Sequence, residues 1–299
     1  PYFKADREKG LLDDDKALEL LECLWLNLSR IRRLVPTGSI ANYQGYPHFE
    51  QACLGGQTPD GRDASNELSY LILQSKKEFP LDFPDMSVRI HSMTPAPFLQ
   101  KAVEVIKEGT GFPKLYNDED IVPLLIAKGA TYAEALDYTG CGCAEVRVIN
   151  RETYMTQGSQ LNIPSAVEMA LRDGYMPRVG GPGERIGLPT GDPRALRTWA
   201  EFWSAFLAQL RNMFHHAFVN RSVGDLTKPA FLAAPFQSML HDLCLEQCLD
   251  IHMDQAKFRG GISLGNLFVI GVGTTIDSLA AVKKLVYEDR RVTMDELLA

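Results

Sequence analysis

A cysteine and a glutamate separated by one residue are the first candidates for chemistry in this sequence. Cys143 and Glu145 follow the small-residue run 139–142 (Thr-Gly-Cys-Gly), which is unsuited to continuing a helix. In an extended loop, side chains two residues apart project to the same side, so this thiol and this carboxyl would share one pocket. The alternative interpretation is a small buried cysteine beside a surface glutamate, and the tripeptide alone does not decide between them.

A second set of candidates is formed by His241, Cys244, Cys248 and His252. Their spacings of 3, 4 and 4 would place them on one helix face, which raises a metal hypothesis. At a rise of about 1.5 Å per residue the outer two would lie roughly 16 Å apart, so one ion could not bind all four. We therefore interpret them as a buried helix face and expect no metal.

The remaining candidates are single residues. His48 and His91 are lone histidines, which either support the fold or line a substrate cavity. Cys141 is the alternative thiol, but no glutamate follows it two residues on, so we assign it to a structural position beside the loop. The glycine-rich stretch 260–273 has no Lys-Ser/Thr phosphate signature and is interpreted as a tight loop.

The bulk composition excludes several classes of protein. The 299 residues are 45% apolar and 23% charged, with a net charge of -7, which argues against a nucleic-acid partner. No apolar run approaches the roughly 20 residues of a membrane helix, and the first residues have no signal-peptide pattern. Six scattered cysteines are typical of reduced thiols. We expect a soluble cytoplasmic protein with no membrane partner.

The elements that must position these residues are mostly helices. Hydrophobic periodicity and breaker residues predict one strand over 85–91 and loops over 55–61 and 180–192. The predicted helices cover 17–34, 64–76, 97–107, 121–128, 132–138, 166–172, 198–219, 236–250 and 276–287. This mixture indicates an α/β architecture in one continuous domain, with a strand order that periodicity does not reveal.

Several stretches, in order along the chain, resemble one family. They are 45–47 (Gly-Tyr-Pro), 55–70 (Gly-Gly-Gln-Thr-Pro-Asp-Gly-Arg-Asp-Ala-Ser-Asn-Glu-Leu-Ser-Tyr), 87–91 (Ser-Val-Arg-Ile-His), 111–113 (Gly-Phe-Pro), 117–119 (Asn-Asp-Glu), 142–145 (Gly-Cys-Ala-Glu) and 277–284 (Asp-Ser-Leu-Ala-Ala-Val-Lys-Lys). The chain resembles the pyruvate formate-lyase-like glycyl radical enzymes, in the branch of the diol, glycerol and choline lyases and the arylacetate decarboxylases. Gly142 to Glu145 stand in the place of that family's Gly-Cys-x-Glu.

The resemblance implies both a fold and a mechanism. The fold is a ten-stranded α/β barrel, two five-stranded halves around a finger loop with Cys143 at its tip, of which residues 1–299 form the central part. The implied mechanism is a radical relay, in which a glycyl radical near the C-terminus takes hydrogen from Cys143 and the resulting thiyl takes hydrogen from the substrate. A group is then eliminated, and Cys143 returns the hydrogen. Glu145 is expected to accept or donate a proton.

The same resemblance implies the partners of the protein. The enzyme would hold no bound cofactor, and its glycyl radical would be installed by a radical S-adenosylmethionine activating enzyme. A homodimer and a small-molecule substrate are expected.

Two departures from the family pattern affect these expectations. The family's Arg-Val-x-Gly-Tyr type motif is absent, so we expect a portion of a longer protein, without its N-terminal part and glycyl radical domain, that is inactive alone. A glycine supplied by a second chain, or a non-catalytic truncated subunit, is the alternative. The family's Gly-Gly-Ala-Lys-Tyr is replaced by 254–258 (Asp-Gln-Ala-Lys-Phe), where Asp254 is the candidate for the usual acidic residue.

The segment 143–154 resembles the arylacetate decarboxylases more than the diol dehydratases. The preferred reaction is therefore decarboxylation of a phenylacetate or indoleacetate type of substrate. Arg147 and Arg151 are then candidate partners for the substrate carboxylate, and His91 and His48 are candidate cavity residues. The alternative is a glycyl radical dehydratase or C–N lyase acting on a small polyol, hydroxyproline or choline type of substrate, with Glu145 taking a hydroxyl proton.

Overall fold

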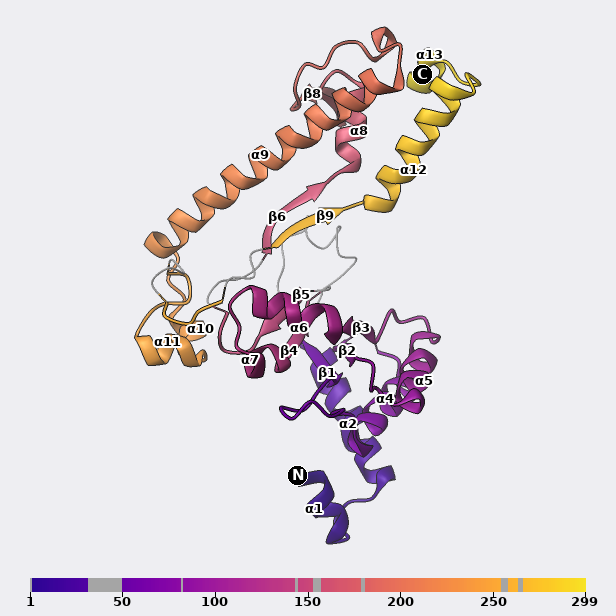
Figure 1. Ribbon diagram of the computed structural model, residues 1–299. Helices are drawn as coiled ribbons and strands as arrows, with labels where there is room; N and C mark the ends of the chain where they lie inside the picture. Colours follow the sequence, from indigo (N-terminus) through magenta and orange to yellow (C-terminus); the bar gives the residue numbers. More distant parts are fainter. Residues whose placement is uncertain are drawn as a thin grey trace. The chain divides into compact units, whose positions relative to one another are not determined.

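The fold is known from a computed structural model of the chain (Figure 1). It describes residues 2–31, 50–81, 83–142, 145–152, 157–178, 181–253, 258–262 and 266–299. The chain divides into two compact units, Pro1–Glu152 and Thr153–Ala299. Each unit is described by itself, and the expected single barrel domain over 1–299 stays a prediction.

The first unit is built on a parallel sheet of three strands in the order β1(Gln51–Gly55), β2(Asp85–Ile90) and β3(Lys114–Asn117). Parallel neighbours require crossover connections, which α4(Glu67–Glu78) and α5(Ala96–Ile106) supply. The predicted strand over 85–91 is confirmed as β2. Five of its six residues are buried, as expected for the middle strand of a parallel sheet, whereas the strands on either side of it had no sequence signal.

Helices cover this sheet and share an apolar core with it. The other helices of the first unit are α1(Tyr2–Glu8), α2(Asp14–Ser29), α6(Asp118–Ala127) and α7(Tyr132–Leu136). The core consists of Trp25, Leu54, Leu73, Met86, Val88, Phe98, Ala102 and Val105. The Trp25 indole N–H donates to the Ser75 hydroxyl at 2.8 Å, so this large buried ring leaves no polar atom unsatisfied.

The first unit ends in the antiparallel hairpin of β4(Tyr138–Cys141) and β5(Glu145–Val148). The predicted helix over 132–138 is wrong at its C-terminal end, because α7 stops at Leu136 and Tyr138 already belongs to β4. Tertiary contacts decide this boundary: the Tyr138 hydroxyl donates to Asp118 at 2.7 Å inside the unit. Local propensity is overridden here by the burial of one polar ring.

The second unit pairs β6(Gln157–Asn162) with β9(Asn266–Ile270) in parallel, and β7(Tyr175–Arg178) with β8(Gly181–Arg185) in an antiparallel hairpin. Its helices are α8(Pro164–Leu171), α9(Trp199–Phe231), α10(Pro235–Ser238), α11(Asp242–Gln247), α12(Val272–Val282), a π-helical segment Lys283–Glu288 and α13(Met294–Leu298). The long helix α9 runs beside α8 and β6 (Figure 1). No helix in the described ranges is long and apolar enough to cross a membrane.

The structure of the second unit corrects four predictions from the sequence. The expected helix over 236–250 is two short helices, because the chain turns after Ser238 and Cys248 adopts a left-handed conformation with φ of 53°. The loop over 180–192 begins with strand β8, and the glycine-rich stretch 260–273 contains strand β9. Helix α9 continues beyond its predicted end to Phe231, and the Arg221–Asp225 ion pair, four residues apart, stabilises this extension.

A buried ion pair joins the sheet to the hairpin. The Arg89 guanidinium donates from Nε and Nη2 to the two Asp118 carboxylate oxygens at 2.9 Å each, and from Nη1 to the Tyr138 carbonyl at 3.0 Å. The same guanidinium lies over the Tyr138 ring, 3.9 Å from its centroid. Gly56 makes room for it, since a Cβ there would lie 2.6 Å from Arg89 Cζ.

This geometry predicts that Gly56→Ala destabilises the protein far more than Gly61→Ala. Both glycines have φ near 80°, so both substitutions cost about 1–2 kcal/mol for the left-handed backbone. Only the Gly56 variant also displaces Arg89 from Asp118, and breaking a buried pair costs about 3–5 kcal/mol. Urea unfolding of the intact protein checks this, and equal losses in the two variants would contradict it.

Candidate active site

The β4–β5 hairpin carries the predicted thiol and carboxyl. Cys141 pairs with Glu145 across the two strands, so residues 142–144 form the connection between them. Gly142 has a φ of 56°, a left-handed conformation that favours glycine. Glu145 is buried, with 5% of its surface exposed. Cys143 lies outside the described residues, so its catalytic role stays a prediction.

The Glu145 carboxylate lies against the backbone of Gly142. A Cβ at Gly142 would be 3.2 Å from Glu145 Oε2, so any larger residue would press on the carboxylate. Burial, assisted by the negative charge of Glu145, raises the pKa of Tyr116 on β3 to about 12. The carboxyl predicted to exchange protons is thus buried beside the hairpin turn.

Gly140 allows the hairpin to approach the sheet closely. A Cβ at Gly140 would collide with the side-chain oxygen of Gln51 on β1 and would lie 3.0 Å from two ring atoms of Tyr116 on β3. The small residues before Cys143 therefore have a steric reason as well as the predicted role of breaking a helix. They let strand β4 pass over two strands of the sheet.

Arg147 and Arg151, the predicted partners of a substrate carboxylate, are each paired with a carboxylate of the protein. Arg147 Nη1 lies 2.8 Å from Glu152 Oε1, and Arg151 Nε lies 2.8 Å from Glu134 Oε1. Burial lowers the pKa of Arg147, but Glu152 and a hydrogen bond with Cys141 raise that pKa above its ordinary value. As substrate contacts, both arginines stay predictions.

His91 anchors a loop. Its Nδ1 accepts the Met93 backbone N–H at 3.3 Å, which leaves the proton on Nε2. That nitrogen lies 3.1 Å from the Gly56 carbonyl and 3.2 Å from Asp63 Oδ1. The imidazole thus ties the loop after β1 to the end of β2. His48 lies outside the described residues, and both histidines stay predictions as cavity residues.

The four spaced histidines and cysteines of the second unit do not share one helix face. His241 precedes α11, Cys244 is buried within it, and Cys248 and His252 follow its end. The interpretation as a single buried face is therefore wrong. In the described part of the chain, no group of three His, Cys, Asp or Glu side chains has the arrangement of a metal site.

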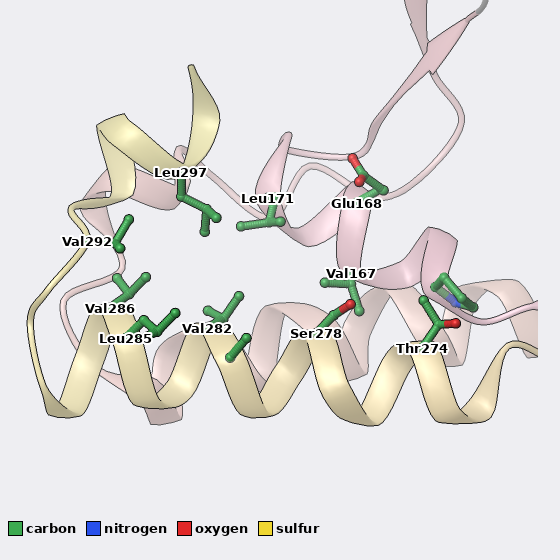
Figure 2. A pocket seen from close by; sticks show the side chains of 12 residues that line it. Val167, Glu168, Leu171, Thr274, Ser278, Val282, Leu285, Val286, Val292 and Leu297 are labelled. Carbon is green, nitrogen blue, oxygen red and sulfur yellow. The ribbon is translucent and has the colours of Figure 1, made fainter.

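The second unit contains a cavity of about 350 Å³ of a different character. Figure 2 shows it between α8 and α12, with Leu171, Val282, Val286 and Leu297 directed into it. Glu168 and Ser278 are among the polar residues of its lining. None of the described residues that line it is a cysteine.

Sequence reasoning missed three charged residues around the hairpin, namely Asp85, Lys114 and Glu152. They lie on β2, on β3 and just after β5, respectively. The pairing of β2 with β3 and the reversal of the chain after β5 bring them close to the hairpin. No regular spacing links them to Cys143. The position of Glu152 close behind the Cys-Ala-Glu motif was the one available signal.

Comparison with known proteins identifies the class to which this fold and hairpin belong. The model of the pyruvate formate lyase-like family matches residues 1–299, and the chain belongs to this family of glycyl radical enzymes. The described helices and strands are part of the barrel fold of these enzymes, as the resemblance implied. The Asp254–Lys257 departure from the family pattern lies outside the described residues.

The individual relatives refine this assignment. An isethionate sulfite-lyase of Desulfovibrio desulfuricans is 48% identical over 100% of this chain and 36% of its own length. A trans-4-hydroxy-L-proline dehydratase of Clostridioides difficile is 34% identical over 100% of this chain and 37% of its own length. The solved structure of the Clostridioides difficile hydroxyproline dehydratase with its substrate matches with a TM-score of 0.83 and 34% identity, covering 100% of this chain and 37% of that one.

These relatives bear on the preferred reaction. The chain spans only about a third of their length (36–37%), so the activity of the whole protein is a proposal. The glycyl radical subunit of a 4-hydroxyphenylacetate decarboxylase from Clostridioides difficile is 26% identical, well below both. The decarboxylase preference taken from residues 143–154 is therefore not supported, and the dehydratase alternative agrees better. A lyase that breaks a C–S bond, as the isethionate sulfite-lyases do, was not among the predictions from the sequence.

The buried Glu152 predicts a pH-dependent stability. Burial raises the pKa of Glu152 from 4.5 to about 7, against the opposing effect of Arg147. Between these values the folded protein binds more protons than the unfolded chain, so stability falls as pH rises from about 4.5 to 7. This loss is on the order of 3 kcal/mol.

The test is thermal unfolding of wild-type protein and Glu152→Gln between pH 5 and pH 8. We expect the wild-type midpoint to fall further across this range than that of the variant. Glu168→Gln, in an exposed Glu–Arg pair, is the matched control and should keep the wild-type pH dependence. A Glu152→Gln protein with an unchanged slope would show that this carboxyl is not the titrating group.

Proposed function

We propose that the protein is a glycyl radical lyase that eliminates a leaving group from a small, hydroxyl-bearing substrate, with isethionate as the first candidate. The observation that carries the proposal is the hairpin, in which buried Glu145 begins the strand that directly follows the Cys143-Ala144 connection. A thiol for hydrogen transfer and a carboxyl for proton transfer then belong to one short turn.

The choice of substrate class rests on the relatives. Isethionate sulfite-lyases of four organisms are 46–48% identical to this chain over its full length. Isethionate is a small alcohol with a sulfonate on the neighbouring carbon. An alcohol next to a leaving group is a substrate for which both hydrogen abstraction and proton removal are required, which matches the pair Cys143 and Glu145.

The reaction balances as an elimination. The Cys143 thiyl takes a hydrogen atom from the carbinol carbon, and Glu145 accepts the hydroxyl proton. The C–S bond then breaks and sulfite leaves with its electron pair, which gives a carbonyl group and a radical on the neighbouring carbon. Cys143 returns the hydrogen atom to that carbon, so isethionate yields acetaldehyde and hydrogen sulfite and the thiyl is regenerated.

A second candidate is a dehydratase that uses the same two residues. The similarity of this chain to the hydroxyproline dehydratase, with 34% identity and a TM-score of 0.83, supports this hypothesis. Here the leaving group is water, and the acidic form of Glu145 protonates the departing hydroxyl. The two candidates differ in the leaving group and not in the hydrogen-transfer step.

The proposal also requires components beyond these 299 residues. A protein glycyl radical generates the thiyl, and its motif is absent from the sequence, so residues 1–299 alone should give no turnover. A radical S-adenosylmethionine activating enzyme and a second copy of the subunit are the proposed partners. A non-catalytic subunit is the competing proposal from another class.

Cys143→Ala in the intact, activated protein is expected to abolish turnover while the glycyl radical still forms. The reason is that the variant keeps the radical source and loses the only group proposed to pass it to the substrate. Electron paramagnetic resonance measures the radical, and anaerobic assays of sulfite release measure turnover. Cys141→Ser is the matched control and should retain turnover, whereas an active Cys143→Ala protein would refute the proposal.

A substrate screen then separates the reaction classes. Isethionate, trans-4-hydroxyproline, glycerol and 4-hydroxyphenylacetate are offered to the activated protein, and sulfite, dehydrated product and carbon dioxide are measured. Sulfite release is the expected result. A dehydrated product would select the second candidate, and carbon dioxide from the arylacetate would overturn both.

A further inference from the structure

We propose that Lys114 is a positioning residue of the candidate active site, which holds the turn between β4 and β5 through the carbonyl group of Gly142. This inference rests on the proposed function, because it concerns how the residues of that site are kept in place. The proposed role of Lys114 requires no contact with substrate or thiol. It acts through Gly142 on the turn that carries Cys143 and Glu145.

The contacts of Lys114 join the sheet to the hairpin. Its Nζ donates to the Gly142 carbonyl oxygen at 2.7 Å and to Asp85 Oδ2 at 2.6 Å. Lys114 lies on β3 and Asp85 on the neighbouring parallel strand β2. The ammonium group also lies 5.0 Å from the centroid of the Phe112 ring. A carboxylate and an aromatic face thus hold the cation where it meets the turn.

Gly142 is therefore fixed from two directions. Lys114 holds its carbonyl oxygen, and the Glu145 carboxylate lies on the other side, where a Cβ on Gly142 would be 3.2 Å from Glu145 Oε2. A peptide unit is planar, so the direction of the Gly142 carbonyl also sets the orientation of the peptide bond that leads to Cys143. Release of the carbonyl would free both the start of the turn and the backbone against which Glu145 lies.

The Asp85 carboxylate helps to hold the Lys114 ammonium group beside the turn. Its side chain is only 7% exposed, and burial raises its pKa, while the hydrogen bond and charge of Lys114 oppose that rise. A hydrogen bond from an ammonium group to a carbonyl is stronger than a neutral one. Asp85 keeps the ammonium in this position, since an isolated lysine side chain would gain more by extending into water.

Removing Lys114 alone would give an ambiguous result. The Lys114→Met variant leaves Asp85 buried without its cation, and this alone destabilises a protein. The double variant Asp85→Asn/Lys114→Met removes both charges and keeps the side chains close to their original size. It removes the contact with Gly142 without leaving a buried, uncompensated carboxylate.

The experiment measures four quantities in the intact, activated double variant: the thermal midpoint, the glycyl radical content, kcat and KM. We expect a thermal midpoint and a radical content close to wild type, a KM within a few-fold, and a kcat lower by about 10- to 100-fold, as for a misplaced reacting group. Lys77→Met is the control, because Lys77 pairs with Glu104 in the same unit and does not contact the turn. All four quantities should stay unchanged in it.

The outcomes separate this inference from the proposed function. An inactive Cys143→Ala protein together with a double variant of wild-type kcat would overturn the role of Lys114 and leave the proposed function intact. A kcat that falls only in proportion to lost stability or lost radical would also overturn it. Turnover in Cys143→Ala would instead refute the proposed function, whatever the double variant does.

Discussion

The buried pair of Arg89 and Asp118 is the interaction on which the rest of the first unit depends. A guanidinium has donors in a fixed fork, and an unpaired one is costly to bury, so its position dictates where acceptors must lie. Here the two Asp118 carboxylate oxygens accept hydrogen bonds from Nε and Nη2 of Arg89. The backbone carbonyls of Leu136 and Tyr138 both accept from Nη1. The middle strand of the sheet, the start of α6 and the start of β4 therefore meet at one point.

The hairpin of β4 and β5 begins at this point and is fixed to the rest of the first unit by two sets of contacts. Its base is held where Tyr138 stacks on Arg89 and donates to Asp118, and its tip is held where Lys114 meets the Gly142 carbonyl. Between these contacts the small residues of β4 let it lie close to the sheet. Hydrogen transfer depends steeply on the separation of the reacting atoms. A hairpin fixed both at its base and at its turn therefore suits the proposed chemistry.

The features that could be predicted from the sequence are those that residues close together in the chain determine. Helices with a clear apolar face, such as α5, and the motif around Cys143 could be found because residues near in the chain determine them. The short strands β3 and β4 could not, since each has only four residues, too few for a clear alternation, and pairs only through tertiary contacts. The break at Cys248 has no breaker residue before it. The preference for arylacetates came from twelve residues, 143–154, and comparison over the whole chain favours another substrate class.

The electrostatics of the first unit limit how an anionic substrate could be held. Arg89, Arg147 and Lys114 are each within 2.9 Å of a protein carboxylate, in pairs with Asp118, Glu152 and Asp85. Breaking such buried pairs is expensive, so these cations offer a substrate anion less attraction than isolated ones would. Arg147 differs from the other two, because burial raises the pKa of its partner Glu152 to about 7 and protonation there would leave the guanidinium charge uncompensated. Of these three cations, Arg147 is therefore the one whose charge is most readily released for the proposed substrate anion, in the state in which Glu152 is protonated.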